Sequence, residues 1–181
     1  GIGYSGLKNS VNELEVRFGT ITKVKISRQQ YNNIIRKLRA CGFEAINLDG
    51  STSLKIYNKN SNIRIEIPGL NMIKKYCKTD SLDGTNCIFM SKTTAVDKDK
   101  NIIKPIDNKD LNIRISYQTE TTHKREEAKI EELKSDWSNL SHKYRLINRV
   151  SFKHKSDTSI RIDLSIVKST TEFQRASMKD I

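Results

Sequence analysis

The stretch NELEVRF, residues 12–18, is the part of the chain that decides the predicted fold. Side chains alternate between the two faces of a strand, so Glu13, Glu15 and Arg17 share one face, while the apolar residues between them share the other. A fully charged face is ordinary on a strand that meets solvent, and periodicity alone leaves this interpretation open. The alternative is chemical. The two carboxylates would lie roughly 6.6 to 6.8 Å apart along the strand, near enough to share one hard cation that prefers oxygen ligands.

Later segments repeat this division into an apolar and a polar face. Alternating runs occur at residues 63–67, 88–94, 111–120, 144–154 and 160–168. Two further runs, 43–48 and 53–57, flank Asp49 and Gly50 and predict a hairpin. The sequence therefore predicts about eight strands, and nearly all of them carry arginine, lysine or a carboxylate on one face.

This shared pattern favours a closed barrel. A two-layer sandwich or an open sheet would turn the charged faces to bulk water. A closed barrel can cover the apolar faces with helices and direct the charged faces inward, where they must pair with each other or with a ligand because unpaired burial is costly. We therefore expect a mainly β (α+β) fold, a closed antiparallel tunnel of eight strands with a few packing helices.

Three segments predict the helices. Ser27 opens a capping-box pattern, and apolar residues then recur at helical spacing until Gly42. We expect this helix to be a packing element and assign it no chemistry. Residues 70–76 predict a short helix, and residues 123–134 predict a helix with a solvated, charged face. The polar segment 98–110 is expected to be an exposed connection.

Length and charge limit the class of protein. The 181 residues fit a single domain, 1–181. The 33 Lys and Arg against 21 Asp and Glu give a formal charge of +12, which favours polyanionic partners without choosing among nucleic acid, polyphosphate and an anionic membrane. No basic amphipathic helix, membrane-spanning run or secretory signal stands out, so we expect a soluble intracellular protein that does not associate with membranes. The three cysteines contain no C-x-x-C pair and predict neither a disulfide scaffold nor a zinc site.

The polar faces of the strands together form a set of charged residues that suggests a site. They are Glu13, Glu15, Arg17, Arg64, Glu66, Lys92, Arg114, Glu120, Arg145, Arg149, Arg161 and Asp163. Basic groups facing a pair of glutamates are what a triphosphate with a bound divalent cation requires. The sequence has no glycine-rich phosphate loop and no Ser-His-Asp or Cys-His set.

Four of these strands also carry a family resemblance. NELEVRF at 12–18, NIRIS at 112–116, RLINRVSF at 145–152 and IDLSIVK at 162–168 resemble successive strand motifs of the triphosphate tunnel metalloenzymes. In particular, they resemble the metal-dependent RNA 5′-triphosphatases of fungal and large DNA virus mRNA capping systems. The run LKNS at 7–10 is similar to viral capping enzymes. The likeness covers most of the chain discontinuously.

The resemblance implies an activity and a set of partners. It implies an eight-stranded tunnel that uses Mg²⁺ or Mn²⁺ to remove the γ-phosphate from triphosphate-ended RNA, the first step of mRNA capping, with nucleoside triphosphates as further candidate substrates. The domain would be the amino-terminal part of a larger capping enzyme, next to guanylyltransferase and methyltransferase domains. A viral protein of this kind would act in the host cytoplasm or be carried in the virion.

The resemblance also assigns roles by position. Glu13 and Glu15 would be metal ligands, and Glu120 would orient or activate the attacking water. Arg64, Lys92 and Arg149 would contact phosphate, and Asp163 would pair with the tunnel's basic residues. Further phosphate or carboxylate partners would be Arg114 and Arg145.

The sequence departs from the family pattern at two places. Ile147 stands where relatives tend to carry a second basic residue, so phosphate binding would be distributed differently. The family's last strand carries a second alternating glutamate motif, and the run STTEFQRASMKDI at 169–181 lacks it. The metal site within these residues is therefore expected to be partial.

Two other functions stay open on the sequence. One is a tunnel phosphohydrolase acting on a small molecule such as tripolyphosphate, thiamine triphosphate or a nucleoside triphosphate. The other is an RNA-binding or polyphosphate-binding module without turnover, which the +12 charge alone would support. For each charged residue, a structural ion pair on a strand face is the simpler interpretation.

Overall fold

The chain forms one curled antiparallel sheet with three helices. The computed structural model describes residues 9–19, 26–47 and 51–172. The strands are β1 (Asn9–Phe18), β2 (Phe43–Ala45), β3 (Ser51–Asn58), β4 (Ile63–Pro68), β5 (Ile88–Thr94), β6 (Ile106–Asn108), β7 (Ile113–His123), β8 (His142–His154) and β9 (Arg161–Thr170). The helices are α1 (Arg28–Ala40), α2 (Leu70–Thr79) and α3 (Ala128–Ser135), and a short 3-10 helix, η1 (Trp137–Asn139), follows α3.

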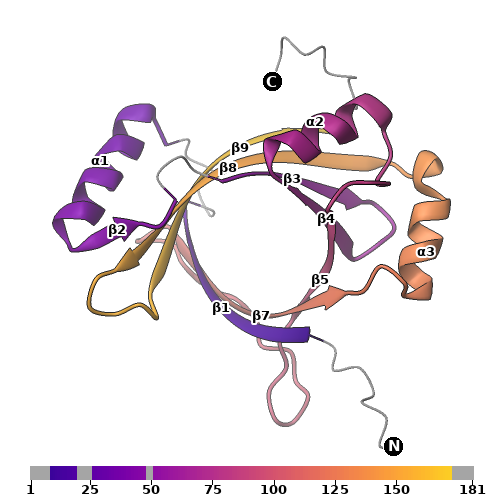
Figure 1. Ribbon diagram of the computed structural model, residues 1–181. Helices are drawn as coiled ribbons and strands as arrows, with labels where there is room; N and C mark the ends of the chain where they lie inside the picture. Colours follow the sequence, from indigo (N-terminus) through magenta and orange to yellow (C-terminus); the bar gives the residue numbers. More distant parts are fainter. Residues whose placement is uncertain (1–8, 20–25, 48–50, 173–181) are drawn as a thin grey trace, which may run out of the picture.

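The sheet curls into a ring (Figure 1). Neighbouring strands run β1-β7-β5-β4-β3-β8-β2, with β6 also paired to β7 and β9 also paired to β8. The mainly β, antiparallel architecture confirms the predicted fold class. The strands number nine rather than eight, and two of them are only three residues long. Within the described ranges, no hydrogen-bonded pairing joins β1 to β9, so the ring is not closed by a ladder.

The predicted hairpin between residues 43–48 and 53–57 is wrong. Strands β2 and β3 both pair with β8, at its end and along its first part respectively, and not with each other. The Asn47 side chain bridges the interval between them, since it donates to the Arg149 carbonyl at 3.1 Å and accepts from the Ser151 amide at 2.8 Å. The predicted turn at Asp49 and Gly50 lies outside the described residues.

Two other predicted elements need correction. The helix expected at 123–134 begins later, because His123 is the last residue of β7, where it pairs with Phe89 and its ring contacts the Ser91 hydroxyl at 2.9 Å. The connection expected at 98–110 contains β6, which pairs with β7 and places Ile106 opposite Ile115.

The hydrophobic core lies outside the ring, on its convex side. Ile56 of β3, with Ile65 and Ile67 of β4, is completely buried beneath the helices α2 and α3. Tyr76 of α2 and Ile130 of α3 are equally buried against them. The apolar faces of these strands therefore point outward to the helices, which leaves their polar faces on the concave side of the sheet. No helix in the described part of the chain has the length and apolar character needed to span a membrane.

Candidate active site

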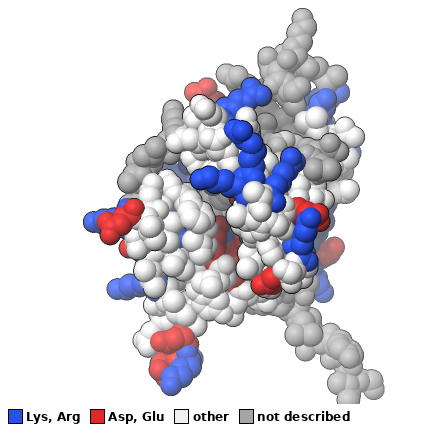
Figure 2. All heavy atoms as spheres, turned by 90° about the vertical axis from the view of Figure 1, so that its left-hand side faces the viewer, with Lys and Arg blue, Asp and Glu red and all other residues white. Residues whose placement is uncertain are grey.

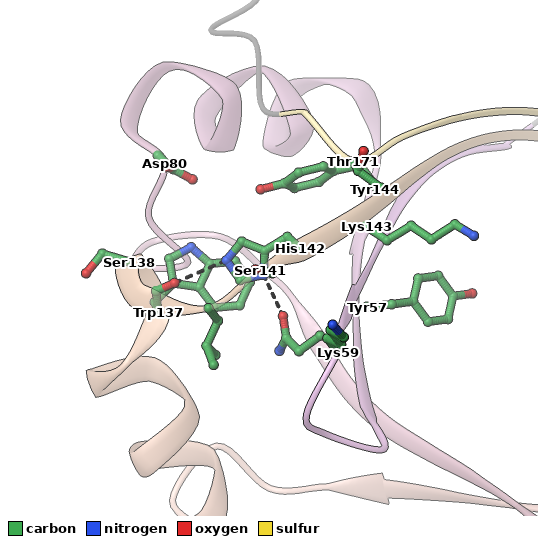
Figure 3. A pocket seen from close by; sticks show the side chains of 12 residues that line it. Tyr57, Lys59, Asp80, Trp137, Ser138, Ser141, His142, Lys143, Tyr144 and Thr171 are labelled. Atoms are coloured by element: carbon green, nitrogen blue, oxygen red, sulfur yellow. Dashed lines mark hydrogen bonds between the residues drawn. The ribbon is translucent and has the colours of Figure 1, made fainter.

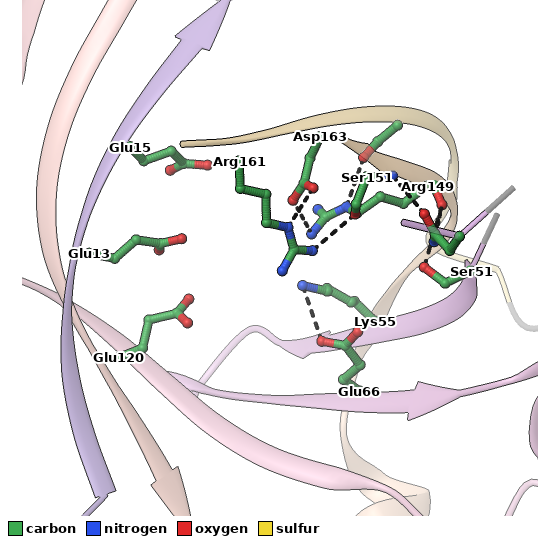
Figure 4. A network of polar contacts seen from close by, with 12 residues as sticks. Glu13, Glu15, Ser51, Lys55, Glu66, Glu120, Arg149, Ser151, Arg161 and Asp163 are labelled. Atoms are coloured by element: carbon green, nitrogen blue, oxygen red, sulfur yellow. Dashed lines mark hydrogen bonds and ion pairs between the residues drawn. The ribbon is translucent and has the colours of Figure 1, made fainter. Parts of the chain in front are cut away.

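One wall of the concave face carries three carboxylates. Strand β1 contributes Glu13 and Glu15, and its antiparallel neighbour β7 contributes Glu120. On the next strand, β5, Lys92 pairs in register with Glu120, and its Nζ lies 2.7 Å from a carboxylate oxygen of Glu13 and 3.5 Å from one of Glu15 and one of Glu120. The three acids stand in a column facing the inside of the ring (Figure 4). All three converge on the Lys92 ammonium, and Glu15 also lies 3.5 Å from Arg17.

Arg64 of β4 completes this wall. Its guanidinium pairs with the Glu120 carboxylate, while its Nε is buried with no hydrogen-bond partner among the described residues. The buried Ser116 hydroxyl, opposite Glu15 on β7, also has no described partner. Burial alone would raise the pKa of Glu120, but hydrogen bonding and charge from Arg64, together with the charge of Lys92, lower that pKa overall. Glu120 is therefore ionised at neutral pH beside Arg64, and Ser116 has free hydrogen-bonding capacity farther along β7, opposite Glu15.

The opposite wall, on β8 and β9, carries two arginines that share one acid. Arg149 lies 3.1 Å from one oxygen of Asp163 and Arg161 lies 2.8 Å from the other. The hydroxyls of Ser165 and Ser151 accept from Arg149 and Arg161 at 3.0 and 3.1 Å. Burial raises the pKa of Asp163, but these arginines and Ser151 outweigh it and lower the pKa overall. This cluster therefore orients two guanidinium groups and keeps a net positive charge.

Sequence reasoning missed Lys55. This residue of β3 pairs with Glu66 of β4 at 3.2 Å, and its ammonium points toward the middle of the ring (Figure 4). The signal was present in the alternation of STSLKIYN, which puts Lys55 on the same face as Ser53 and Tyr57. The sequence analysis places Arg161 on the polar face without giving it a role, yet its side chain lies between the two walls in Figure 4.

The remaining predicted site residues lie outside these two clusters. Arg114 pairs with Asp107 of β6 at 2.6 Å and is largely exposed. Arg145 has no ion pair within the described ranges, and it is aligned with Lys55 across β8 and β3. Ile147 is buried on the concave face between Arg145 and Arg149, so an apolar side chain separates the two arginines.

The carboxylates of the acid wall are suitable ligands for a hard divalent cation, but in this structure the Lys92 ammonium lies among them. No group of three His, Cys, Asp or Glu in the part of the chain described here is arranged to hold a metal. Glu13, Glu15 and Glu120 instead surround the Lys92 ammonium. Carboxylate oxygens are the ligands that Mg²⁺ and Mn²⁺ prefer, so Glu13 and Glu15 could hold such an ion once Lys92 moves away.

A cavity of about 650 Å³ lies elsewhere and includes none of the predicted site residues (Figure 3). Its wall contains Trp137 stacked on His142, with ring centres 4.1 Å apart. Burial lowers the pKa of His142, and a neutral ring has one N–H, which it donates to the Trp137 carbonyl at 3.1 Å. The other ring nitrogen faces the Asn58 Oδ1, and because an oxygen cannot donate, exchange of the amide oxygen and nitrogen lets Asn58 donate to the ring and gives its buried nitrogen a partner. These contacts explain the polar groups of this cavity as structural.

Comparison with known proteins identifies the fold. Neither protein-family models nor curated protein sequences match this chain. Among solved structures, it is similar to the triphosphatase of the Mimivirus capping enzyme, with a TM-score of 0.52 and 16% sequence identity over 90% of this chain and 73% of that one. The chain therefore shares its fold with that triphosphatase. At this identity, the likeness establishes the fold and leaves the chemistry of this chain to its own residues.

Proposed function

We propose that this protein is a metal-dependent RNA 5′-triphosphatase that removes the γ-phosphate from triphosphate-ended RNA, the first step of mRNA capping. The observation that carries the proposal is the division of the concave face. Glu13, Glu15 and Glu120 gather on one wall, and Arg149 and Arg161 face them from the other. The fold shared with a viral capping triphosphatase supports the same conclusion.

The acid wall activates the terminal phosphate. Glu13 and Glu15 would hold Mg²⁺ or Mn²⁺, which would neutralise and polarise the terminal phosphoryl group when bound. Lys92 leaves the carboxylates and binds phosphate oxygen. Arg64 does so through its unpartnered Nε. Glu120, ionised because its pKa is lowered, accepts a hydrogen bond from the attacking water and orients it.

The basic wall holds the rest of the triphosphate. Arg149 binds phosphate oxygens directly, and Asp163 is a positioning residue because it fixes both Arg149 and Arg161. Arg145 and Arg114 are further phosphate or carboxylate partners. Water attacks the γ-phosphorus, the bond to the β–γ bridging oxygen breaks, and the products are inorganic phosphate and a diphosphate-ended RNA.

The wider assignment follows from the same proposal. The domain, residues 1–181, acts beside guanylyltransferase and methyltransferase domains of a capping apparatus, and nucleoside triphosphates are secondary substrates. Strands β1 and β9 each have one edge without a strand partner among the described residues, and a further strand with carboxylates would pair there and complete the metal ligands. A chain extended beyond Ile181 tests this by its metal affinity.

Phosphate release from RNA labelled at the γ-position tests the function. We expect release that depends on manganese or magnesium, with Glu13→Gln and Glu15→Gln each lowering kcat by about 10²–10³-fold because a metal ligand is lost. Glu126→Gln removes an exposed carboxylate that has no ion pair in the described structure, and it should leave kcat unchanged.

Three other results would contradict the proposal. RNA binding without phosphate release would indicate a binding module without turnover. A strong preference for tripolyphosphate or thiamine triphosphate over RNA would indicate a small-molecule phosphohydrolase. Undiminished release by both Glu13→Gln and Glu15→Gln would remove the acid wall from the mechanism.

A further inference from the structure

Helix α1 carries an unbalanced positive charge. Its sequence, RQQYNNIIRKLRA, contains Arg28, Arg36, Lys37 and Arg39 and no acidic residue. All four side chains are exposed, and none forms an ion pair with a described residue. On the concave face, by contrast, Arg64, Arg149 and Arg161 each face a carboxylate within the protein. Arg36 donates a hydrogen bond to the Asn33 side chain, but the cations of α1 have no carboxylate partner in the described structure.

This charge does not serve the stability of the helix. Arg28 stands at the amino end, where the helix dipole disfavours a cation. Arg36 and Arg39 are three residues apart, so their like charges repel on one side of the helix. Lys37 and Arg39 do suit the carboxyl end, but no residue of α1 is fully buried, so packing provides little compensation. An arrangement that costs stability and has no counter-charge in the described structure indicates an external one.

The position of α1 links it to the candidate active site. The segment that follows it pairs through β2 with the end of β8, and the Lys155 amide donates to the Gly42 carbonyl at 3.0 Å. Arg149 lies on this strand a few residues before that contact. On the side of the molecule where α1 lies, Lys and Arg side chains gather next to a hollow with acidic atoms at its floor (Figure 2).

We propose that α1 binds the phosphate backbone of the RNA chain downstream of its 5′ end. This inference rests on the proposed function, which places the 5′-triphosphate on the concave face. Arginine and lysine bind successive backbone phosphates without reading the bases, so α1 selects a polynucleotide over a small triphosphate. The proposal adds a binding role to a helix that the sequence analysis predicts as a packing element.

An anionic membrane is the competing partner for a basic amphipathic helix. Insertion would require a free apolar face. The apolar residues of α1 are instead half-buried against the body of the protein: Tyr31, Ile34, Ile35 and Leu38. The exposed groups of α1 are its cations and neutral polar side chains, and α1 lies on the side of the molecule where Lys and Arg gather next to a hollow (Figure 2). These two observations favour RNA.

Binding of an RNA that cannot be hydrolysed tests the inference separately from catalysis. The α1 variant combines Arg28→Gln, Arg36→Gln, Lys37→Gln and Arg39→Gln. The matched control changes Lys98, Lys100, Lys104 and Lys109 to Gln, which removes the same charge from exposed lysines near β6. Fluorescence anisotropy with a 5′-hydroxyl 20-nucleotide RNA is measured at several salt concentrations.

We expect the α1 variant to bind this RNA at least about tenfold more weakly, with the slope of log K against log salt smaller by about 2 to 3 because each lost phosphate contact removes about 0.7. A partial variant, Lys37→Gln with Arg39→Gln, should show about half of that change in slope. The control should stay within about twofold of the wild type.

Equal RNA binding by the α1 variant and the control would overturn the inference. So would loss of binding to phosphatidylserine vesicles in the α1 variant with RNA binding retained. If the wild type releases no phosphate from RNA but the α1 variant still loses RNA binding, the proposed function fails and the RNA contact stands.

Discussion

The two walls of the concave face arrange their charges differently. On the β1, β5 and β7 side, three carboxylates surround Lys92 and also pair with Arg17 and Arg64, so acids and bases are equal in number. On the β8 and β9 side, Arg149 and Arg161 share Asp163, so base is in excess. A network that only stabilised the fold would balance its charges locally, because buried excess charge is costly. Clustered carboxylates on one wall and an excess of arginine on the other suit a ligand that has a cation at one end and phosphates along its length.

Of the changes that test the contrast between the two walls, removal of Asp163, the acid on the basic wall, should have the largest effect. We expect Asp163→Asn to reduce kcat/KM for triphosphate-ended RNA by about 10–100-fold, because the two arginines lose the group that orients them. Since Asp163 positions groups that bind the substrate, most of the loss should fall on KM. Steady-state kinetics with the labelled RNA measures both constants.

A second variant separates positioning from folding. Asp163→Glu keeps the charge and should recover part of the lost kcat/KM, whereas a purely structural role would make it at least as harmful as Asp163→Asn. Thermal unfolding of both variants provides the control. Unchanged kinetics in Asp163→Asn would mean that Arg149 and Arg161 hold their positions without it.

The acid wall shows how far sequence reasoning could reach. Glu13 and Glu15 could be predicted as neighbours because alternation along one strand is a local property. The sequence analysis groups them with Glu120 and Lys92 by strand face and strand order. The antiparallel register of β7 with β1 and β5 brings these side chains together. Short local patterns therefore identified most of the charged concave face.

Pairings between distant segments could not be predicted in the same way. The hairpin between β2 and β3 was a reasonable local interpretation, but both strands bind β8, which lies about 100 residues later. The Asn47 side chain takes over part of the hydrogen bonding there, and nothing in a single sequence marks that role. The position of α1 beside the end of β8 depends on the same long-range pairing, so the sequence analysis could not relate the cations of α1 to the concave face.

The depressed pKa values predict that both walls contribute to the loss of stability in acid. The pKa of Glu120 and that of Asp163 are both lowered in the folded protein. Each carboxylate therefore contributes stability that is present above its ordinary pKa and is lost as the pH falls through the lowered one. We expect the free energy of unfolding to decrease from about pH 5 downward, with a smaller pH slope in Glu120→Gln and in Asp163→Asn.

Urea unfolding at a series of pH values measures these slopes. On unfolding in acid, the wild type takes up protons at these carboxylates, and each variant should take up fewer protons by as much as about one. Lys92 has the opposite sign, because its pKa is raised above 10.5 by its carboxylate partners despite burial, so its contribution is lost only as the pH rises through that raised value. An acid slope identical to the wild type in both variants would show that neither carboxylate is paired in solution.

The convex side of the acid wall gives the smallest expected effect. Behind β4, Ile65 is fully buried under helices, whereas behind β1, Leu14 and Phe18 are 68% and 73% exposed. We expect the double substitution Leu14→Thr and Phe18→Thr to change the free energy of unfolding by no more than about 0.5 kcal/mol, since threonine keeps strand propensity and little buried surface is lost. Urea unfolding measures the change. A loss above about 2 kcal/mol would mean that this face is covered in solution, and a matching fall in molecular mass by light scattering would identify the cover as a second copy of the chain.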